Sequence, residues 1–231
     1  MEYPAKYPAK QQQNEVEWQT GEVPVSTRFD DPYFSIENGL AETNHVFLAG
    51  NNLPERFLDG FQIAELGFGT GLNLLAALKA WRESGAPGVL NFTSFEAYPM
   101  QAKEMIRAQT AFPELQTIAT ELAGHWNAGK TEISLPDLRF SLVLGDARET
   151  LPKWYGKADA WFLDGFSPAK NPELWEASLM AEVGAHTAPN GTVATYTAAG
   201  FVRRGLKAAG FEVSRTPGYG RKRHMSCGCM V

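Results

Sequence analysis

Phe61-Gln-Ile-Ala-Glu-Leu-Gly-Phe-Gly-Thr-Gly-Leu72 is the stretch of sequence that decides the fold. An apolar, strand-like run leads into glycines at 67, 69 and 71, and a helical run begins directly at Leu72. Such a turn lets backbone N–H groups approach a ligand closely, because no Cβ blocks them. Leu72 stands where the dinucleotide fingerprint G-x-G-x-x-G needs its last glycine. The stretch therefore predicts a ligand-binding turn that is not a dinucleotide site; the alternative is an ordinary glycine-rich turn.

The composition is that of an ordinary globular protein. The chain has 231 residues, of which 44% are hydrophobic and 20% charged, a size that fits one large α/β domain. No apolar run approaches the ~20 residues that span a bilayer, and residues 1–13 contain no apolar signal segment. Cys227 and Cys229 would point the same way in a strand, which is poor geometry for a mutual disulfide, and they lack the partners of a metal site. We therefore expect a reduced, cytoplasmic protein without a membrane segment or a metal.

The charge is distributed unevenly. Residues 201–231 contain seven Lys or Arg and one acid, a net charge of +6 that leaves −11 for the rest of the chain. Such asymmetry is typical of a localised polyanion site on an acidic body. The alternative is a solvated basic face without a ligand.

Strand-like and helical stretches alternate from residue 61 onward. We expect strands at 61–66, 89–96, 140–144, 158–163, 191–197, 211–216 and 224–231, with helices at 72–84, 99–111, 115–126, 172–186 and 200–209. Strand–helix alternation gives a mostly parallel sheet, whereas the last two strands are joined by a short turn and must pair antiparallel. The prediction is an α/β doubly wound fold with seven strands, closed by an antiparallel C-terminal hairpin. Residues 1–27 are expected to form a mobile arm, 28–60 a lead-in segment packed on the domain, and 61–231 the domain.

Acidic residues end four successive predicted strands: Glu65, Glu96, Asp146 and Asp164. In open α/β sheets the ligand binds beyond the carboxyl ends of the strands. Because burying an uncompensated charge is costly, these acids indicate a cationic ligand that forms several hydrogen bonds.

The second informative segment is Asp164-Gly-Phe-Ser-Pro-Ala-Lys-Asn-Pro172. Its glycine, prolines and asparagine predict a rigid loop that holds an acid, an aromatic ring (Phe166) and a lysine (Lys170). We expect Asp164 to lie at the reacting end of the cleft. The alternative is a plain loop between a strand and a helix.

These patterns together resemble those of the Rossmann-like class I S-adenosylmethionine-dependent methyltransferases. In that class Glu-x-Gly-x-Gly-x-Gly follows a strand, as Glu65 to Gly71 does here, and an antiparallel hairpin closes the sheet. Nitrogen-directed members place an Asp/Asn-Pro-Pro-aromatic loop where Asp164 stands. This chain keeps the acid and the aromatic residue but not the paired prolines.

Longer motifs resemble the methyltransferase domain of the MnmC family, the tRNA 5-methylaminomethyl-2-thiouridine biosynthesis proteins. The motifs are Asp31-Pro-Tyr-Phe34 with Asn38-Gly-Leu, Glu65 to Asn73, Asp159 to Pro172, and Ala199 to Leu206 with Gly218 to Arg223. The resemblance covers about residue 25 to the end. It implies methylation of the primary amine of 5-aminomethyl-2-thiouridine at the tRNA wobble position. In many members a C-terminal FAD-dependent oxidase domain generates that amine; whether this chain stands alone or is part of a two-domain protein stays open.

For the cofactor, we expect Glu96 to accept hydrogen bonds from the ribose hydroxyls, and Asp146 from the adenine amine beside the Ala147 N–H. The alternatives are caps, Glu96 for the helix that begins near Pro99 and Asp146 for a helix at 148–155. Glu65 either orients the glycine turn or meets the ligand's ammonium through water. The predicted S-adenosylmethionine site comprises Glu65, Gly67, Gly69, Gly71, Asn73, Glu96, Asp146 and Ala147.

For the substrate, we predict Asp164 and Phe166 as catalytic residues. Asp164 either takes a proton from the acceptor amine or only orients it, and Phe166 with Tyr33 or Phe34 stacks on an unstacked uracil. Lys170, Arg203, Arg204, Lys207, Arg221, Lys222 and Arg223 are predicted to bind phosphates of the anticodon stem-loop.

Competing functions are a methyltransferase for another amine, on a small molecule or a protein, and a non-catalytic tRNA-binding module. Leu72 and the terminal hairpin disfavour a nicotinamide-dependent oxidoreductase.

Overall fold

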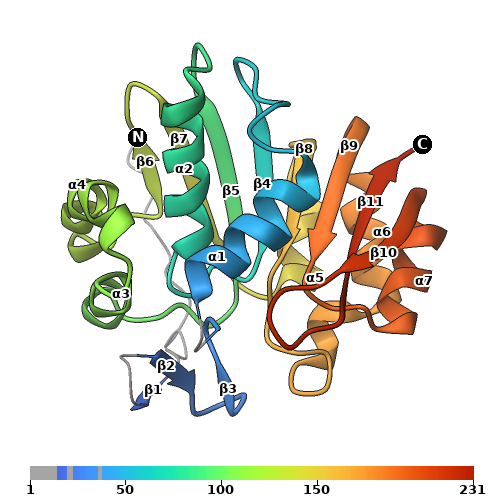
Figure 1. The fold of residues 1–231 in the computed structure, drawn as a ribbon, viewed down its shortest axis with the longest axis horizontal. Coiled ribbons are helices and arrows are strands. Elements are labelled where there is room, and N and C mark those ends of the chain that lie inside the picture. Colours follow the sequence, from blue (N-terminus) through green and yellow to red (C-terminus); the bar gives the residue numbers. More distant parts are fainter. Residues whose placement is uncertain (1–14, 20–22, 36–37) are drawn as a thin grey trace, which may run out of the picture.

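The computed structural model describes residues 15–19, 23–35 and 38–231. Within these residues the main sheet has the strand order β10-β11-β9-β8-β4-β5-β7-β6 (Figure 1). Its parallel strands are β4 (Gln62–Leu66), β5 (Leu90–Glu96), β7 (Leu138–Leu144), β8 (Ala158–Leu163) and β9 (Thr187–Thr195). Antiparallel to their neighbours are β6 (Glu132–Ser134), β10 (Phe211–Pro217) and β11 (His224–Met230).

The predicted fold class is confirmed, including the hairpin, in which Phe211 lies opposite Met230 and Pro217 opposite His224. The predicted number of strands was one too low. The additional strand, β6, pairs with β7 at the edge of the sheet. With three residues, it is too short for side-chain alternation to distinguish it from a loop.

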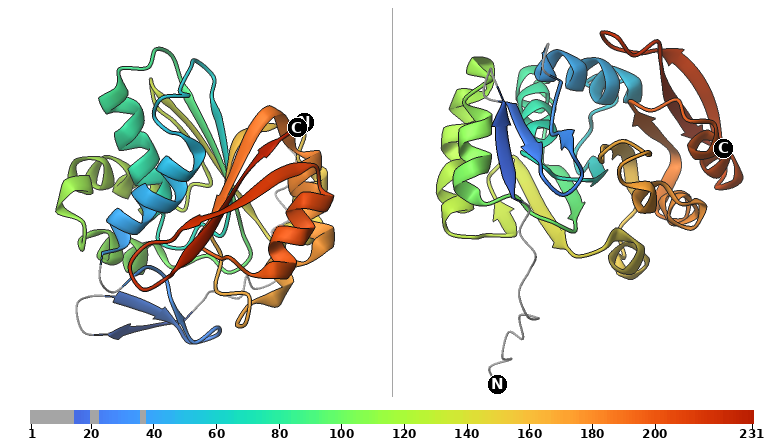
Figure 2. Two further views of the ribbon diagram at one scale, coloured as in Figure 1. Left: turned by 45° about the vertical axis from the view of Figure 1, so that its right-hand side comes forward. Right: turned by 90° about the horizontal axis from the view of Figure 1, so that it is seen from below.

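Helices cover both faces of the sheet (Figure 2). One hydrophobic core contains side chains from α2 (Leu72–Ser84), α3 (Ala102–Gln109) and α4 (Gln116–Asn127). The other contains side chains from α5 (Ala147–Thr150), α6 (Ala177–Ala185) and α7 (Gly200–Ala208). Successive strand residues point to opposite faces, so Trp161 packs into the second core and Phe162 into the first.

The segment between residues 28 and 60 contains a helix that the sequence analysis did not predict. Asn38 caps α1 (Gly39–Thr43), which continues as a π-helical turn, η1 (Asn44–Leu48), and a 3-10 turn, η2 (Ala49–Asn51). Phe47 is buried in the first core, with its ring 5.4 Å from that of Phe162. This helix forms one wall of the site described below.

The N-terminal residues that the structure describes form a second, three-stranded sheet. It consists of β1 (Val16–Gln19), β2 (Val23–Ser26) and β3 (Asp31–Pro32). The predicted arm of residues 1–27 therefore has regular structure in its described part, while residues 1–14 and 20–22 lie outside the described residues. None of the helices described has the length and apolar character to cross a membrane.

The connections around β4 create the site. From β4 the chain proceeds to β5 on one side, and it later returns to β8 on the other side of β4. In open α/β sheets this reversal leaves a crevice at the carboxyl ends of the strands. The glycine turn follows β4, and Asp164 follows β8.

Candidate active site

A cleft of about 870 Å³ opens at this switch point. Its lining residues include Gly67, Gly69, Glu96, Asp146 and Asp164. The volume is in the range of small-molecule sites. The cleft therefore brings the glycine turn together with three of the four strand-end acids.

The glycine turn is packed directly on the backbone that follows β8. Gly67, Gly69 and Gly71 have φ angles of 89°, 54° and 74°. A Cβ on Gly67 would lie 2.0 Å from the carbonyl oxygen of Asp164. Glycine is thus required at 67 by the close approach of two backbone segments as well as by the positive φ.

Glu96 holds the glycine turn and also faces the cleft. Its Oε2 accepts hydrogen bonds from the backbone N–H groups of Phe68 (3.0 Å) and Gly69 (3.1 Å), and Oε1 accepts from Tyr98 (2.7 Å). Burial raises the pKa of Glu96, while these backbone hydrogen bonds lower it. The N-cap of α3 is Gln101, so Glu96 does not have the predicted alternative role.

Asp146 has the capping arrangement that was the alternative to its adenine role. It precedes α5, and its Oδ1 accepts from the backbone N–H of Arg148 at 2.9 Å. The Arg148 guanidinium lies 2.7 Å from Oδ2 and lowers the pKa of Asp146. Asp146 and Ala147 both line the cleft, so their contact with adenine stays a prediction.

Asn73 connects the acids beneath the cleft. Its Nδ2 donates to Glu65 Oε1 (2.8 Å) and to Asp164 Oδ2 (2.7 Å), while its Oδ1 accepts from Thr43 (3.0 Å). Glu65 is fully buried and also accepts from Ser94 at 2.5 Å; burial raises its pKa well above the usual range.

Two residues of the predicted cofactor site, Glu65 and Gly71, are not among those that line the cleft. Glu65 is hydrogen-bonded to Asn73, at the start of α2 directly after the turn, and its predicted roles toward the turn or the ligand stay predictions. Gly71 is the N-cap of α2 and does not line the cleft.

Asp164 has the electrostatics of a proton acceptor. The pKa of Asp164 is raised to about 7, mainly by burial and in smaller part by the nearby charge of Glu42, while Asn73 and Lys222 act to lower it. A carboxylate with a pKa near neutral is suited to general base catalysis at neutral pH.

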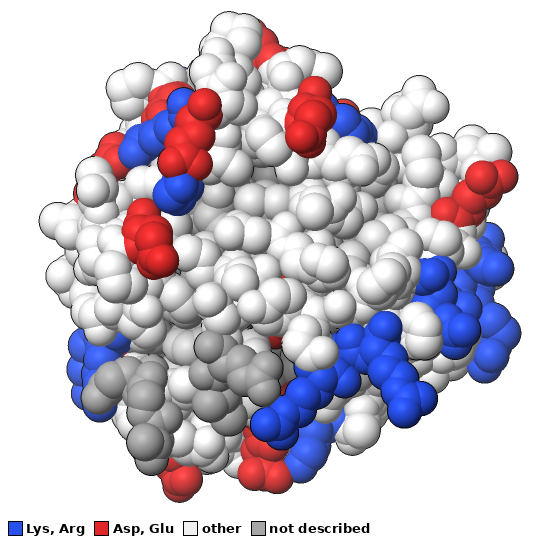
Figure 3. All heavy atoms as spheres, in the orientation of Figure 1, with Lys and Arg blue, Asp and Glu red and all other residues white. Residues whose placement is uncertain are grey.

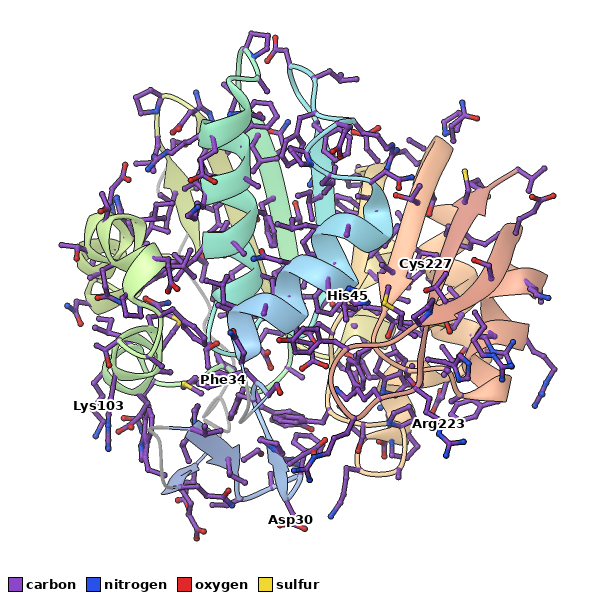
Figure 4. The ribbon with its side chains drawn as sticks, in the orientation of Figure 1. Asp30, Phe34, His45, Lys103, Arg223 and Cys227 are labelled. Atoms are coloured by element: carbon purple, nitrogen blue, oxygen red, sulfur yellow. The ribbon has the colours of Figure 1, made fainter. Side chains whose placement is uncertain are left out.

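The loop after Asp164 is fastened to the N-terminal sheet. The Phe166 ring stacks on Phe29 (4.7 Å) and meets the edge of Tyr33 (5.1 Å). Lys170 Nζ lies 2.6 Å from Asp30, which Figure 4 shows near the tip of β3. One face of Phe166 is thus already covered, and Lys170 already has an acidic partner; their roles toward tRNA stay predictions.

Glu42 and Tyr196 are among the cleft residues that were not predicted from the sequence. Tyr196 directly follows β9, donates to the carbonyl of Gly165 (2.6 Å), and has a pKa raised well above its usual value by burial. The rule that identified acids at strand ends would have found it if applied to tyrosine. Glu42 lies on α1, just after the Asn38-Gly-Leu motif, in a segment for which no helix was predicted.

The basic residues of the C-terminal segment, which include all the predicted phosphate-binding residues except Lys170, gather on one side of the molecule. Figure 3 shows a band of Lys and Arg over the region of α7 and the β10–β11 hairpin. We call this the basic band: Arg203, Arg204, Lys207, Arg215, Arg221, Lys222 and Arg223, of which all but the half-buried Arg203 are exposed. Arg221 and Lys222 also line the cleft, so the band begins at the cleft and extends away from it.

The Asn73 network leads to a first prediction. Asn73→Ala is expected to lower the free energy of unfolding by about 1–3 kcal/mol, because it leaves a buried Glu65 oxygen without its donor. Chemical denaturation measures this. Asn91→Ala, which removes a bond to the Gly60 carbonyl at the sheet periphery, is the control and is expected to cost less. Equal losses in the two variants would show that the network contributes no more than a peripheral hydrogen bond.

Comparison with known proteins now identifies the family. Residues 113–231 match the model of a family described as S-adenosyl-L-methionine-dependent methyltransferase. The chain belongs to this methyltransferase family. The predicted enzyme class and cofactor are thereby confirmed.

The relatives also confirm the resemblance to MnmC. The chain is 48% identical to the tRNA 5-methylaminomethyl-2-thiouridine biosynthesis bifunctional protein MnmC of Caulobacter vibrioides, over 89% of this chain and 36% of that protein. Identity to the protein of the same name from Hahella chejuensis is 45%, over 93% of this chain and 36% of the relative. The chain thus spans about a third of the length of these relatives. The crystal structure of MNMC2 from Aquifex aeolicus matches with a TM-score of 0.76 and 26% identity, over 96% of this chain and 71% of that one.

The methyltransferase site fits S-adenosylmethionine. The turn at Gly67 and Gly69 offers close backbone approach, and the carboxylates of Glu96 and Asp146 line the cleft with it. The Glu96 carboxylate is held by backbone N–H groups and lines the cleft, where a hydroxyl group of a ligand can reach it. A ligand with hydroxyls, an amine and positive charge matches this set of donors and acceptors.

Proposed function

We propose that this chain methylates the primary amine of 5-aminomethyl-2-thiouridine at the tRNA wobble position, giving 5-methylaminomethyl-2-thiouridine. The observation that carries the proposal is Asp164, a carboxylate of pKa about 7 held by Asn73 in a cleft that opens onto the basic band. The names of the relatives support the same modification pathway. An FAD-dependent oxidase, in the same protein or in a partner, is proposed to supply the amine.

The chain's own residues have three tasks in this reaction. A primary alkylamine is mostly protonated at neutral pH, and only its neutral form is nucleophilic, so Asp164 accepts the proton as the lone pair becomes available. The floor of the cleft, fixed by Asn73, keeps Asp164 in one position. Phosphate contacts with the basic band hold the anticodon stem-loop. When bound, S-adenosylmethionine supplies a methyl group whose bond to the positively charged sulfur breaks as the acceptor nitrogen bonds to it.

The direct test uses labelled S-adenosylmethionine and two tRNAs that differ only in the 5-aminomethyl group of the wobble nucleoside. We expect label in the tRNA that carries the amine, and 5-methylaminomethyl-2-thiouridine on nucleoside analysis. Cofactor binding without transfer to this tRNA would overturn the proposed acceptor and leave the methyltransferase family intact.

The basic band gives a second prediction. The triple variant Arg204→Gln, Lys207→Gln, Arg223→Gln is expected to weaken tRNA binding by about 10- to 100-fold and to reduce the slope of log affinity against log salt by about 3. Filter binding over a range of salt concentrations measures both. Lys103→Gln, which lies at the left of Figure 4 while Arg223 lies at the right, is the control and should change neither. An unchanged salt slope in the triple variant would exclude the band as the tRNA surface.

A further inference from the structure

Lys222 places a primary alkylammonium group inside the cleft. Its Nζ lies 2.7 Å from Glu42 Oε1 and 4.1 Å from the centre of the Tyr196 ring. The Glu42 side chain is 13% exposed and that of Lys222 46%. The acid and the aromatic ring therefore belong to the wall of the cleft, and the lysine reaches them from the exposed β10–β11 loop.

The groups around this ammonium are fixed by the fold. The neighbour of Glu42 on α1, Thr43, donates to Asn73, which holds Asp164. The Tyr196 hydroxyl is bonded to the Gly165 carbonyl, next to Asp164. Glu42 raises and Lys222 lowers the pKa of Asp164, so both charges act on the proposed base.

A carboxylate beside the face of an aromatic ring is suited to binding an alkylammonium ion. We propose that Glu42 and Tyr196 form the subsite for the ammonium group of the acceptor, next to Asp164, and that Lys222 marks its position in this structure. This inference rests on the proposed function, whose acceptor is a primary alkylammonium. The acceptor competes with Lys222 for the subsite, and an acceptor that carries a carboxylate at this position is repelled by Glu42.

The Lys222 side chain can also bind phosphate instead of Glu42. Arg221 and Arg223 flank it in the basic band, so phosphates that bind there can also draw the lysine away from Glu42. Binding of the anticodon stem-loop would thus help the ammonium of its modified base to displace the lysine from Glu42.

The test compares two anticodon stem-loop RNAs that differ only at the wobble 2-thiouridine, which carries 5-aminomethyl in one and 5-methyl in the other. Their dissociation constants are measured with S-adenosylhomocysteine present, and the ratio is the amine preference. Phosphate contacts cancel in this ratio. We expect the wild type to prefer the aminomethyl RNA and Glu42→Gln to reduce the preference about tenfold or more. Lys222→Met is expected to lower the affinity for both RNAs. It should nevertheless increase the amine preference severalfold, because the competing lysine ammonium is absent.

Lys207→Met is the matched control, since it removes an exposed basic residue of the band that lies on α7 and does not flank Lys222, and it should leave the ratio unchanged. Thermal melting and S-adenosylhomocysteine affinity show that each variant is folded. An unchanged preference in Glu42→Gln, or a reduced one in Lys222→Met, overturns the inference. If either of these two results is found and the wild type still methylates the aminomethyl RNA, the proposed function stands and only the subsite is wrong. If the wild type neither methylates nor prefers that RNA, the proposed function itself fails.

Discussion

Replacing Asp164 by asparagine is expected to lower the rate of methyl transfer by about 10²- to 10⁴-fold, the usual contribution of a general base. Asparagine has the same shape, and its carbonyl oxygen can still accept the hydrogen bond from Asn73 that Asp164 Oδ2 accepts at 2.7 Å. The floor of the cleft is therefore preserved and only the proton acceptor is lost. Single-turnover transfer to tRNA carrying the aminomethyl group measures the rate, and S-adenosylmethionine affinity should change less than about threefold on the same geometric grounds.

The pH dependence distinguishes a base from a group that only orients the amine. Because the pKa of Asp164 is raised to about 7, the carboxyl is protonated below that pH and unable to accept a proton. The rate in the wild type should rise as the pH increases through about 7. The residual rate of Asp164→Asn should lack this step. If both enzymes show the same pH profile, Asp164 only orients the acceptor.

Stability gives an independent check on the same carboxyl. Its pKa is about 7 in the folded protein against 3.8 for an unperturbed aspartate, so the folded state retains the proton more strongly. The contribution of this group to stability is present below about pH 4 and is lost as the pH rises through 7. Asp164→Asn should therefore be more stable than the wild type at pH 8, and this difference should shrink at pH 5. Denaturant unfolding at the two pH values tests the environment of Asp164 without reference to any substrate.

Local patterns explain what the sequence could predict. The glycine turn, the acids at strand ends and the terminal hairpin each depend on a few neighbouring residues, and Gly67, Glu96 and Asp164 all reach the cleft as expected. The parallel strands bring these separate motifs to one edge of the sheet, which follows from topology alone.

What the sequence could not predict depends on contacts between distant segments. Glu42 belongs to the site because α1 packs across the sheet, and its partner Lys222 lies 180 residues away. The capping role of Asp146 was an expected alternative, but its ion pair with the Arg148 guanidinium was not. Glu65 is at a strand end like the other acids, yet the adjacent Asn73 and Ser94 use its oxygens beneath the turn. Strand-end position predicts that an acid is near the site; its hydrogen-bond partners decide whether it faces the ligand.

Gly67→Ala is expected to reduce methyl transfer by about 100-fold, with a parallel loss of S-adenosylmethionine affinity. The new Cβ would lie 2.0 Å from the Asp164 carbonyl oxygen, so one of two backbone segments must shift by about 1 Å, a displacement that can cost two orders of magnitude in rate. Isothermal titration with the cofactor and single-turnover transfer measure the two losses.

Gly85→Ala is the matched control for this substitution. Gly85 ends α2 with φ of 67°, close to the positive φ of Gly67, but a Cβ there meets no atom within 4 Å. Both alanines have the strain of a left-handed backbone, about 1–2 kcal/mol. Only the alanine at position 67 also clashes with the Asp164 carbonyl oxygen. Gly85→Ala should lower stability while leaving cofactor affinity unchanged. If Gly67→Ala also leaves cofactor affinity unchanged, the glycine serves only the turn. If cofactor affinity falls in Gly67→Ala and not in Gly85→Ala, the close approach of the turn to Asp164 is what joins the cofactor site to the proposed base.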